Sequence, residues 1–479
     1  MATVNYATLI PNNVNLSTDR RLQRTLEKWH PKFLNWWLHR GPKDFQTFEV
    51  YLRTAVGVDR GNWAKFGFVR MPDYRWGILL APAVEDRKIP FGEHTGEPVW
   101  HDVPGEYRAL IKRLLVIQGD TEPASVEQQR FLGHTAPSLY DMRNLFQVNV
   151  EEARHLWAMV YLLHKYFGRD GREEADSLLE RTSGDEDQPR ILGAFNEETP
   201  DWLSFFLFTS FTDRDGKMQL ECLAQSGFDP LSRTCRFMLT EEAHHMFVGK
   251  SGVERILKRT CQEMNDAGIS DPTDEGAIRA LGVMDLPTIQ RKMNFHFSVT
   301  LDLFGSEIST NAANAFTAGI KGRFHEIDIA DDHQLLNDSY PLLQHLDGKF
   351  VTNQVPAISA INARLVDDYI TDCENIVSAW NKTIARSNIE FALSLPHRGF
   401  NRQIGSFADL NVTPEGTILN DADWAAAVVD YLPSKEDLTY ILSLMDANLT
   451  AGEYASWIAP PKNGVGGKPG DFEYVLIDR

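Results

Sequence analysis

The sequence predicts a mainly α-helical protein with a four-helix bundle at its centre and loop-rich extensions at both ends. Apolar residues recur at helical spacing over most of the chain beyond residue 105, and glycine and proline are sparse inside those stretches. Two of the stretches also carry nearly the same charged pentapeptide. The expected helical segments are 106–122, 137–167, 201–224, 231–260, 275–320, 355–394 and 421–446.

The chain divides into three predicted parts. A tryptophan-rich stretch over residues 28–37 is expected to serve as a packing element within the first part. Proline and glycine recur between residues 66 and 105, which predicts loops with short strands at most. The three parts are an N-terminal extension packed on the bundle, a helical domain, and a C-terminal loop, helix and tail, at residues 1–105, 106–395 and 396–479.

The composition excludes several classes of protein. With 43% hydrophobic and 24% charged residues over 479 positions, the chain has an ordinary globular composition and is neither disordered nor a fibrous rod. A net charge of −19 argues against a nucleic-acid partner, because nucleic acids are polyanions. The four cysteines form no Cys-x-x-Cys pair, which argues against zinc ribbons and Cys-ligated iron–sulfur clusters.

A cytoplasmic location without membrane contact is expected. The sparse, scattered cysteines fit a reducing compartment, and no secretory signal is readable at the N-terminus. The most apolar short stretch, residues 202–211, has about half the length that a bilayer span requires, so it predicts a buried helix.

The two charged pentapeptides are the most informative feature of the sequence. Residues 151–155 read Glu-Glu-Ala-Arg-His, and residues 241–245 read Glu-Glu-Ala-His-His. Each contains a Glu-x-x-His pair, whose carboxylate and imidazole share one face of a helix. One such pair is typical of a solvated surface. Two copies on two helices, joined by one carboxylate from each of two further helices, form the ligand set of ferritin-like dinuclear iron or manganese bundles.

The second pentapeptide permits two frames. Glu241 with His244 is a Glu-x-x-His pair, and so is Glu242 with His245. Alignment with the first pentapeptide favours Glu242 and His245, which leaves His244 as a pocket residue or a neighbour of the ligands. The extra carboxylates, Glu151 and Glu241, either orient the ligands or are solvated.

The bundle scheme requires one more acidic residue on the helix before each pentapeptide. Glu122 and Asp213 fit best, because each follows a threonine at the end of an apolar run. Since Glu122 precedes Pro123, we expect a kink or π-bulge there. The acidic residues that fit this alignment less well are Asp120, Glu127, Asp215 and Glu221.

Four carboxylates and two imidazoles without a thiolate suit two iron ions, and they also admit manganese. In the absence of a metal, so many carboxylates in a protein core would repel one another and raise one another's pKa values. The predicted metal ligands, and hence the predicted catalytic residues, are Glu122, Glu152, His155, Asp213, Glu242 and His245.

Among the functions of dinuclear iron sites, the sequence favours oxygen activation. The chain is much longer than a single bundle, which disfavours iron storage, and Met159 stands where a radical-generating subunit usually has tyrosine. We therefore expect O2 as a co-substrate. No flavin, nicotinamide or iron–sulfur motif is visible, so electrons from NAD(P)H would come from a separate reductase.

Several other residues are candidates for binding. Gln118, one turn before Glu122, is expected to line a pocket. Arg398 and Arg402, in a loop with His397, are candidates for holding an anionic substrate group, although ordinary surface charge explains them equally well. The run Arg255, Lys258 and Arg259 is a weaker candidate for phosphate contact. An acidic cluster that we interpret as an exposed helix end, rather than a cation site, comprises His325, Asp328, Asp331, Asp332 and His333.

With these residues in place, the sequence resembles the benzoyl-CoA epoxidases, the oxygenase components of benzoyl-CoA oxygenase systems. The resemblance spans the chain and includes the two pentapeptides, Glu122, Asp213, the N-terminal LIPNNVNL and the loop HRGFNRQIGSF. Aspartate at position 213 departs from the glutamate of general ferritin-like sites but matches these epoxidases.

The resemblance implies a specific reaction and a specific partner. The reaction is the NADPH- and O2-dependent conversion of benzoyl-CoA to 2,3-epoxy-2,3-dihydrobenzoyl-CoA in aerobic benzoate catabolism. The six predicted ligands would bind two iron ions, and the partner would be a reductase component with FAD and iron–sulfur clusters. The alternatives are another di-iron oxygenase, of the arylamine oxygenase or desaturase type, and a non-catalytic helical scaffold.

Overall fold

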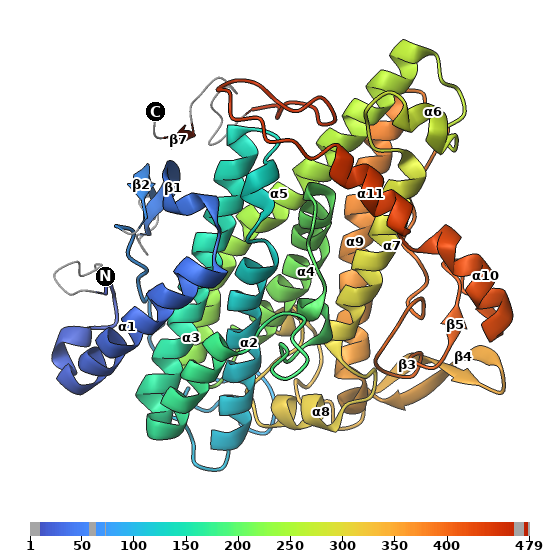
Figure 1. Cartoon of the computed structure of the whole chain (residues 1–479). Helices are drawn as coiled ribbons and strands as arrows, with labels where there is room; N and C mark the ends of the chain where they lie inside the picture. The colour runs from blue at the N-terminus through green and yellow to red at the C-terminus, as the bar shows by residue number, and fades with distance from the viewer. Residues whose placement is uncertain (1–9, 57–63, 72, 464–473, 478–479) are drawn as a thin grey trace.

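The computed structural model describes residues 10–56, 64–71, 73–463 and 474–477, and helices dominate it (Figure 1). The prediction of a mainly α fold is confirmed. The long helices are α1 (Arg20–Arg40), α2 (Arg108–Gln128), α3 (Leu139–Glu180), α4 (Trp202–Leu223), α5 (Asp229–Ala267), α7 (Leu286–Leu301) and α9 (Ile361–Arg386). The shorter helices are α6 (Glu275–Arg279), α8 (Thr310–Thr317), α10 (Asp421–Tyr431) and α11 (Lys435–Ser443).

Helices α2 to α5 pack side by side as a four-helix bundle (Figure 1). Short connections join α2 to α3 and α4 to α5, which makes each pair antiparallel neighbours. Every residue of α3 from Leu139 to His164 is buried, and so is every residue of α4 from Trp202 to Asp215. The apolar stretch over residues 202–211 is therefore a buried bundle helix, as the sequence predicts.

Two features of the bundle helices differ from the sequence-based expectation. Helix α2 continues through Pro123 to Gln128 as an uninterrupted α-helix, so the expected π-bulge beside Glu122 is absent from it. Helix α3 is instead broken at Gly168, whose φ of 61° and ψ of −124° lie outside the helical region. Glycine adopts this backbone conformation without the steric clash that a Cβ atom would cause. The break lies beyond the 151–155 pentapeptide.

The tryptophan-rich stretch belongs to helix α1, which the sequence analysis did not predict. The Asp19 side chain caps this helix by accepting a hydrogen bond from the Leu22 amide at 2.9 Å. Trp29 and Phe33 pack their rings against Trp157 of α3, with centroid separations of 4.8 and 5.4 Å. Helix α1 thus covers the outer side of α3 with an aromatic layer.

Small sheets surround the bundle in the described part of the chain. Strands β1 (Phe48–Val56), β2 (Ala64–Arg70) and β7 (Val475–Ile477) form an antiparallel sheet in the order β2-β1-β7, which joins the two ends of the chain. Strands β3 (Ser339–Leu346) and β4 (Lys349–Pro356) form a hairpin where the sequence analysis predicted no strands. Strands β5 (Asn411–Val412) and β6 (Ile418–Leu419) pair as a short ladder. The part boundaries at residues 105 and 395 stay a prediction.

The predicted segment 275–320 is three separate helices, α6, α7 and α8, and the predicted segment 421–446 is two, α10 and α11. None of the helices in the described ranges has both the length and the apolar character of a membrane span.

Two glycines of α5 allow it to approach α4 closely. A Cβ atom at Gly249 would lie 2.4 Å from Thr209 Oγ1 and 2.6 Å from the Phe206 carbonyl oxygen, and one at Gly252 would lie 2.2 Å from the Phe206 ring. No larger residue fits at either position without moving one of the helices. Because α4 and α5 also carry predicted metal ligands, this close contact fixes how far apart those ligands lie.

We expect Gly249→Ala to lower the free energy of unfolding by about 3 kcal/mol or more, because the new methyl group meets helix backbone that cannot rotate away. Chemical denaturation measures the effect. Gly216→Ala is the matched control in the same bundle, because a Cβ there meets nothing within 4 Å, and it should leave stability equal or slightly higher. Equal stability of the two variants would contradict this account of the α4–α5 contact.

Candidate metal centre

The six predicted ligands converge at one place inside the bundle. They come from all four helices: Glu122 from α2, Glu152 and His155 from α3, Asp213 from α4, and Glu242 and His245 from α5. None of these side chains is more than 6% exposed. The bundle therefore buries four carboxylates and two imidazoles together.

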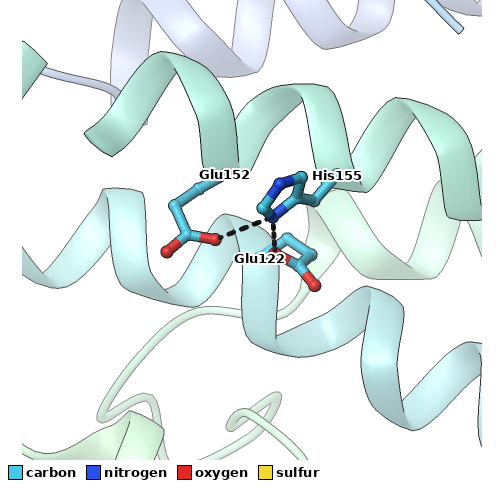
Figure 2. Close-up of side chains that lie close together, drawn as sticks. All are labelled: Glu122, Glu152 and His155. Carbon is cyan, nitrogen blue, oxygen red and sulfur yellow. Dashed lines mark ion pairs between the residues drawn. The ribbon is translucent and has the colours of Figure 1, made fainter. Parts of the chain in front are cut away.

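One half of the cluster surrounds the Nδ1 atom of His155 (Figure 2). This nitrogen lies 3.4 Å from Glu122 Oε2 and 3.5 Å from Glu152 Oε2. Glu242 Oε1 lies 3.6 Å from the same atom.

The other half surrounds the Nδ1 atom of His245. Glu152 Oε1 and Glu242 Oε2 each lie 3.4 Å from this nitrogen, and Asp213 Oδ2 lies 3.9 Å from it. Glu152 and Glu242 therefore present one oxygen to each imidazole, whereas Glu122 faces only the His155 half and Asp213 only the His245 half. This is the arrangement of two shared carboxylates between two neighbouring cation positions.

The donor atoms fit metal ions. The Nδ1 atoms of His155 and His245 and the Oδ2 atom of Asp213 are buried without a hydrogen-bond partner. Buried polar atoms are nearly always paired, so unpaired donors that point at one another indicate a ligand between them. Glu122, Glu152 and His155 form one potential metal-binding group, and Glu152, Glu242 and His245 form a second. Nitrogen and oxygen donors of this kind suit iron or manganese.

Without a metal, the cluster binds protons more strongly than isolated side chains do. Burial, followed by the nearby Glu152 carboxylate, raises the pKa of Glu122 to about 8. Burial and Glu152 also raise the pKa of Asp213 well above its usual range. Burial alone would lower the pKa values of His155 and His245, but the surrounding carboxylates raise both. Protons and metal ions therefore compete for this cluster.

Each imidazole of the cluster is held by the extra glutamate of the opposite pentapeptide. His155 Nε2 donates to Glu241 Oε2 at 3.1 Å, and His245 Nε2 donates to Glu151 Oε2 at 3.1 Å. A proton on Nε2 leaves the lone pair of Nδ1 directed at the cluster. Glu151 and Glu241 are thus buried orienting groups, which resolves the alternative that the sequence left open.

Glu151 is anchored by a residue that the sequence analysis missed. Arg53, on strand β1, donates from Nε to Glu151 Oε1 at 2.6 Å. Burial would raise the pKa of Glu151, but the charge of Arg53 and the hydrogen bond with His245 hold it well below its usual range. Gln147 also donates to Glu151, at 2.5 Å. Arg53 belongs to no recognisable sequence motif and lies far from the pentapeptides in sequence, so only the fold reveals its contact with Glu151.

His244 lies apart from the donor atoms. Its Nε2 atom is 3.5 Å from the guanidinium of Arg143. Burial, together with the charge of Arg143, lowers the pKa of His244 to about 3, so its ring is neutral. The structure accordingly brings His245, not His244, to the carboxylates.

A cavity of about 290 Å³ lies between α2 and α4 beside the cluster. Gln118 and Thr121 of α2 and Thr212 and Asp215 of α4 line it, and Thr121 and Thr212 directly precede the predicted ligands Glu122 and Asp213. Gln118 also donates to Glu122 Oε1 at 2.9 Å. The cavity wall further includes Leu114, Ile117, Leu192, Phe195, Leu303, Phe304, Arg113 and Lys321.

The two loop arginines lie elsewhere. Arg402 is buried and donates from Nε to Asp302 Oδ1 at 2.7 Å, and Arg398 is paired with Asp367. Neither lines the cavity beside the cluster. Through Asp302, Arg402 instead holds the backbone next to Leu303, and Leu303 lines the cavity. A direct contact of Arg398 or Arg402 with substrate stays a prediction.

The remaining charged candidates have structural partners. The acidic cluster consists of a short 3-10 helix, Glu326–Asp328, and the loop that follows it, and Arg323 donates to both Glu326 and Asp331. Asp120 accepts hydrogen bonds from Arg190 at 3.2 Å and from the Ile191 amide at 2.7 Å. The other partners are Arg190 for Glu127, Gln219 for Asp215, Lys217 for Glu221, Asp141 for Arg255 and Glu263 for Arg259.

The chain is similar over its whole length to a characterised protein. Benzoyl-CoA oxygenase component B of Aromatoleum evansii is 58% identical to it over 475 residues, which cover 99% of this chain and 100% of the relative. No protein-family model matches the chain.

We expect Glu152→Ala to remove most of the bound metal, because its carboxylate faces both imidazoles, whereas Glu122→Ala should weaken only the His155 half. Metal content per chain after reconstitution and desalting measures this difference. Glu173→Ala is the control, since that glutamate is exposed on α3 and paired only with Arg169. Equal metal content in the Glu152→Ala variant and the wild type would contradict the shared-carboxylate geometry.

Proposed function

The chain belongs to the benzoyl-CoA oxygenase component B family, and we propose that it is the oxygenase component that epoxidises benzoyl-CoA. In this proposal two iron ions are held by Glu122, Glu152, His155, Asp213, Glu242 and His245. The observation that carries the proposal is the pair of buried, unpartnered imidazole nitrogens that share two carboxylates. A cytoplasmic location is part of the proposal and is supported by four free, buried cysteines.

The proposed reaction adds one atom of O2 across the 2,3 bond of the benzoyl ring and releases the other atom as water. NADPH supplies two electrons through a separate reductase component containing FAD and iron–sulfur clusters. When bound, the iron ions supply the redox chemistry that reduces O2. The chain itself has to bind the thioester, orient the ring and exclude water.

The cavity beside the cluster supports binding of the benzoyl group. Apolar side chains from α2 and from the segment around residue 303 line it, and such walls favour an aromatic ring over water. Gln118 lies in this wall while its amide nitrogen donates to Glu122. Its amide therefore links the position of a bound substrate to the position of one ligand.

The outer part of the cavity supports binding of the coenzyme A portion. Arg113 and Lys321 line the cavity, and Arg113 is exposed. Lys321 donates to Gln219 at 2.5 Å, which holds its ammonium group at the wall. Phosphate groups pair strongly with such cations, and a chain with a net charge of −19 would otherwise repel them.

Turnover with isotopically labelled O2 tests the proposed function. Iron-loaded protein, NADPH and the reductase component should convert benzoyl-CoA to a product that carries one labelled oxygen atom. Oxygen consumption without benzoyl-CoA turnover would favour another di-iron oxygenase, of the arylamine oxygenase or desaturase type. Absence of iron from the purified and reconstituted protein would favour a helical scaffold.

We expect the double variant Arg113→Gln, Lys321→Gln to raise the KM for benzoyl-CoA about tenfold at nearly constant kcat, because it removes charged hydrogen bonds to phosphate. A short benzoyl thioester that lacks the nucleotide should show no such increase. Arg398→Gln in the same assay tests the loop arginine. An increase in KM confined to Arg398→Gln would contradict this placement of the coenzyme A portion.

A further inference from the structure

We propose that the outer face of α5, together with the adjoining end of α9, is the docking surface for an acidic patch of the electron-donating reductase. This inference rests on the proposed function, because only an oxygenase supplied by a partner needs such a surface. The surface consists of Phe247, Lys250 and Lys258 of α5, Lys382 and Arg386 of α9, and Lys462 of the adjoining C-terminal segment, and we call it the cationic face.

Helix α5 offers the most direct route from solvent to the metal centre. The ligand-bearing stretches of α3 and α4 are fully buried, and the partly exposed residues of α2 near Glu122 line the substrate cavity. On α5, by contrast, Ala243 is exposed directly beside the ligand Glu242, and Phe247 and Lys250 continue the same exposed stripe. Among the described residues, only the thickness of α5 thus separates the cluster from solvent on this side.

Electron transfer requires this kind of proximity. Two electrons have to pass from the reductase to the metal pair, with no atom exchanged between the proteins. The rate of electron tunnelling falls steeply with distance, so the partner has to dock where the covering layer is thin. The outer face of α5 satisfies this requirement and leaves the substrate cavity between α2 and α4 open.

The charge of this surface contrasts with that of the whole chain. Lys250, Lys258, Lys382, Arg386 and Lys462 are all exposed, and none of them forms an ion pair with another described residue. Among the described residues that line the adjoining groove, Glu254 is the one carboxylate, and it accepts a hydrogen bond from Thr383. On a chain with a net charge of −19, a group of unpaired cations attracts an acidic partner to this face.

The cationic face also has a preformed groove and an apolar anchor. A cavity of about 770 Å³ between α5 and α9 is lined by Phe247, Lys258, Arg386 and Lys462. Phe247 is 53% exposed, which is unusual for a large aromatic side chain and typical of an interface anchor. Arg255 holds the groove wall in place, because it donates to the Ala459 carbonyl at 2.6 Å and pairs with Asp141.

The double charge reversal Lys258→Glu, Arg386→Glu tests the proposal. We expect the KM for the reductase in NADPH-driven turnover to rise about tenfold or more at low ionic strength. At high salt, the difference in KM between the variant and the wild type should be smaller, because salt screens the charges. The matched control is Arg24→Glu, Lys28→Glu, which changes the charge equally on exposed positions of α1. The KM of the control for the reductase should stay within about twofold of wild type.

Phe247→Ser should raise the same KM without altering its salt dependence.

A second measurement separates docking from catalysis. Protein that is chemically reduced, without reductase, and then mixed with benzoyl-CoA and O2 should turn over once at the wild-type yield in the Lys258→Glu, Arg386→Glu variant. An unchanged KM for the reductase, or a loss of single turnover in this variant, would overturn the docking surface. Failure of the reduced wild type to convert benzoyl-CoA would contradict the proposed function and the docking surface together.

Discussion

The structure depends on the burial of four carboxylates that face one another inside an apolar bundle. Such a cluster is costly unless positive charge neutralises it, and in the metal-free protein this favours protons on the cluster: the pKa values of Glu122, Asp213 and the two histidines are all raised. The unpartnered Nδ1 atoms and the two shared carboxylates leave room for cations. The surrounding helices hold this arrangement, since α4 and α5 approach closely at Gly249.

The two pentapeptides act as one unit. Each supplies a Glu-x-x-His pair to the cluster, and its remaining glutamate fixes the imidazole of the other pentapeptide. Arg53 connects this hydrogen-bond network to strand β1 through Glu151, and β1 pairs with β7 from the far end of the chain. The N- and C-terminal segments are thereby connected to the candidate metal centre and do more than cover the bundle.

Much of the bundle and the candidate ligands could be predicted from the sequence, because helical periodicity and a repeated Glu-x-x-His pair are local signals. The contribution of Arg53 was not predictable, since it depends on a strand that meets α3 only in the fold. Helix α1 was missed because its tryptophans and Pro31 obscure an otherwise regular apolar face. The β3–β4 hairpin turns at Asp347 and Gly348, a two-residue turn signal that the prediction left unused between the expected helical segments 275–320 and 355–394.

Anomalous diffraction at the iron edge from crystals of the iron-loaded protein tests the central claim most directly. We expect two adjacent peaks, one beside Nδ1 of His155 and Glu122 and the other beside Nδ1 of His245 and Asp213, with Glu152 and Glu242 contacting both. A single peak, or iron bound at the loop of Glu326, Asp331 and His333, would contradict the account.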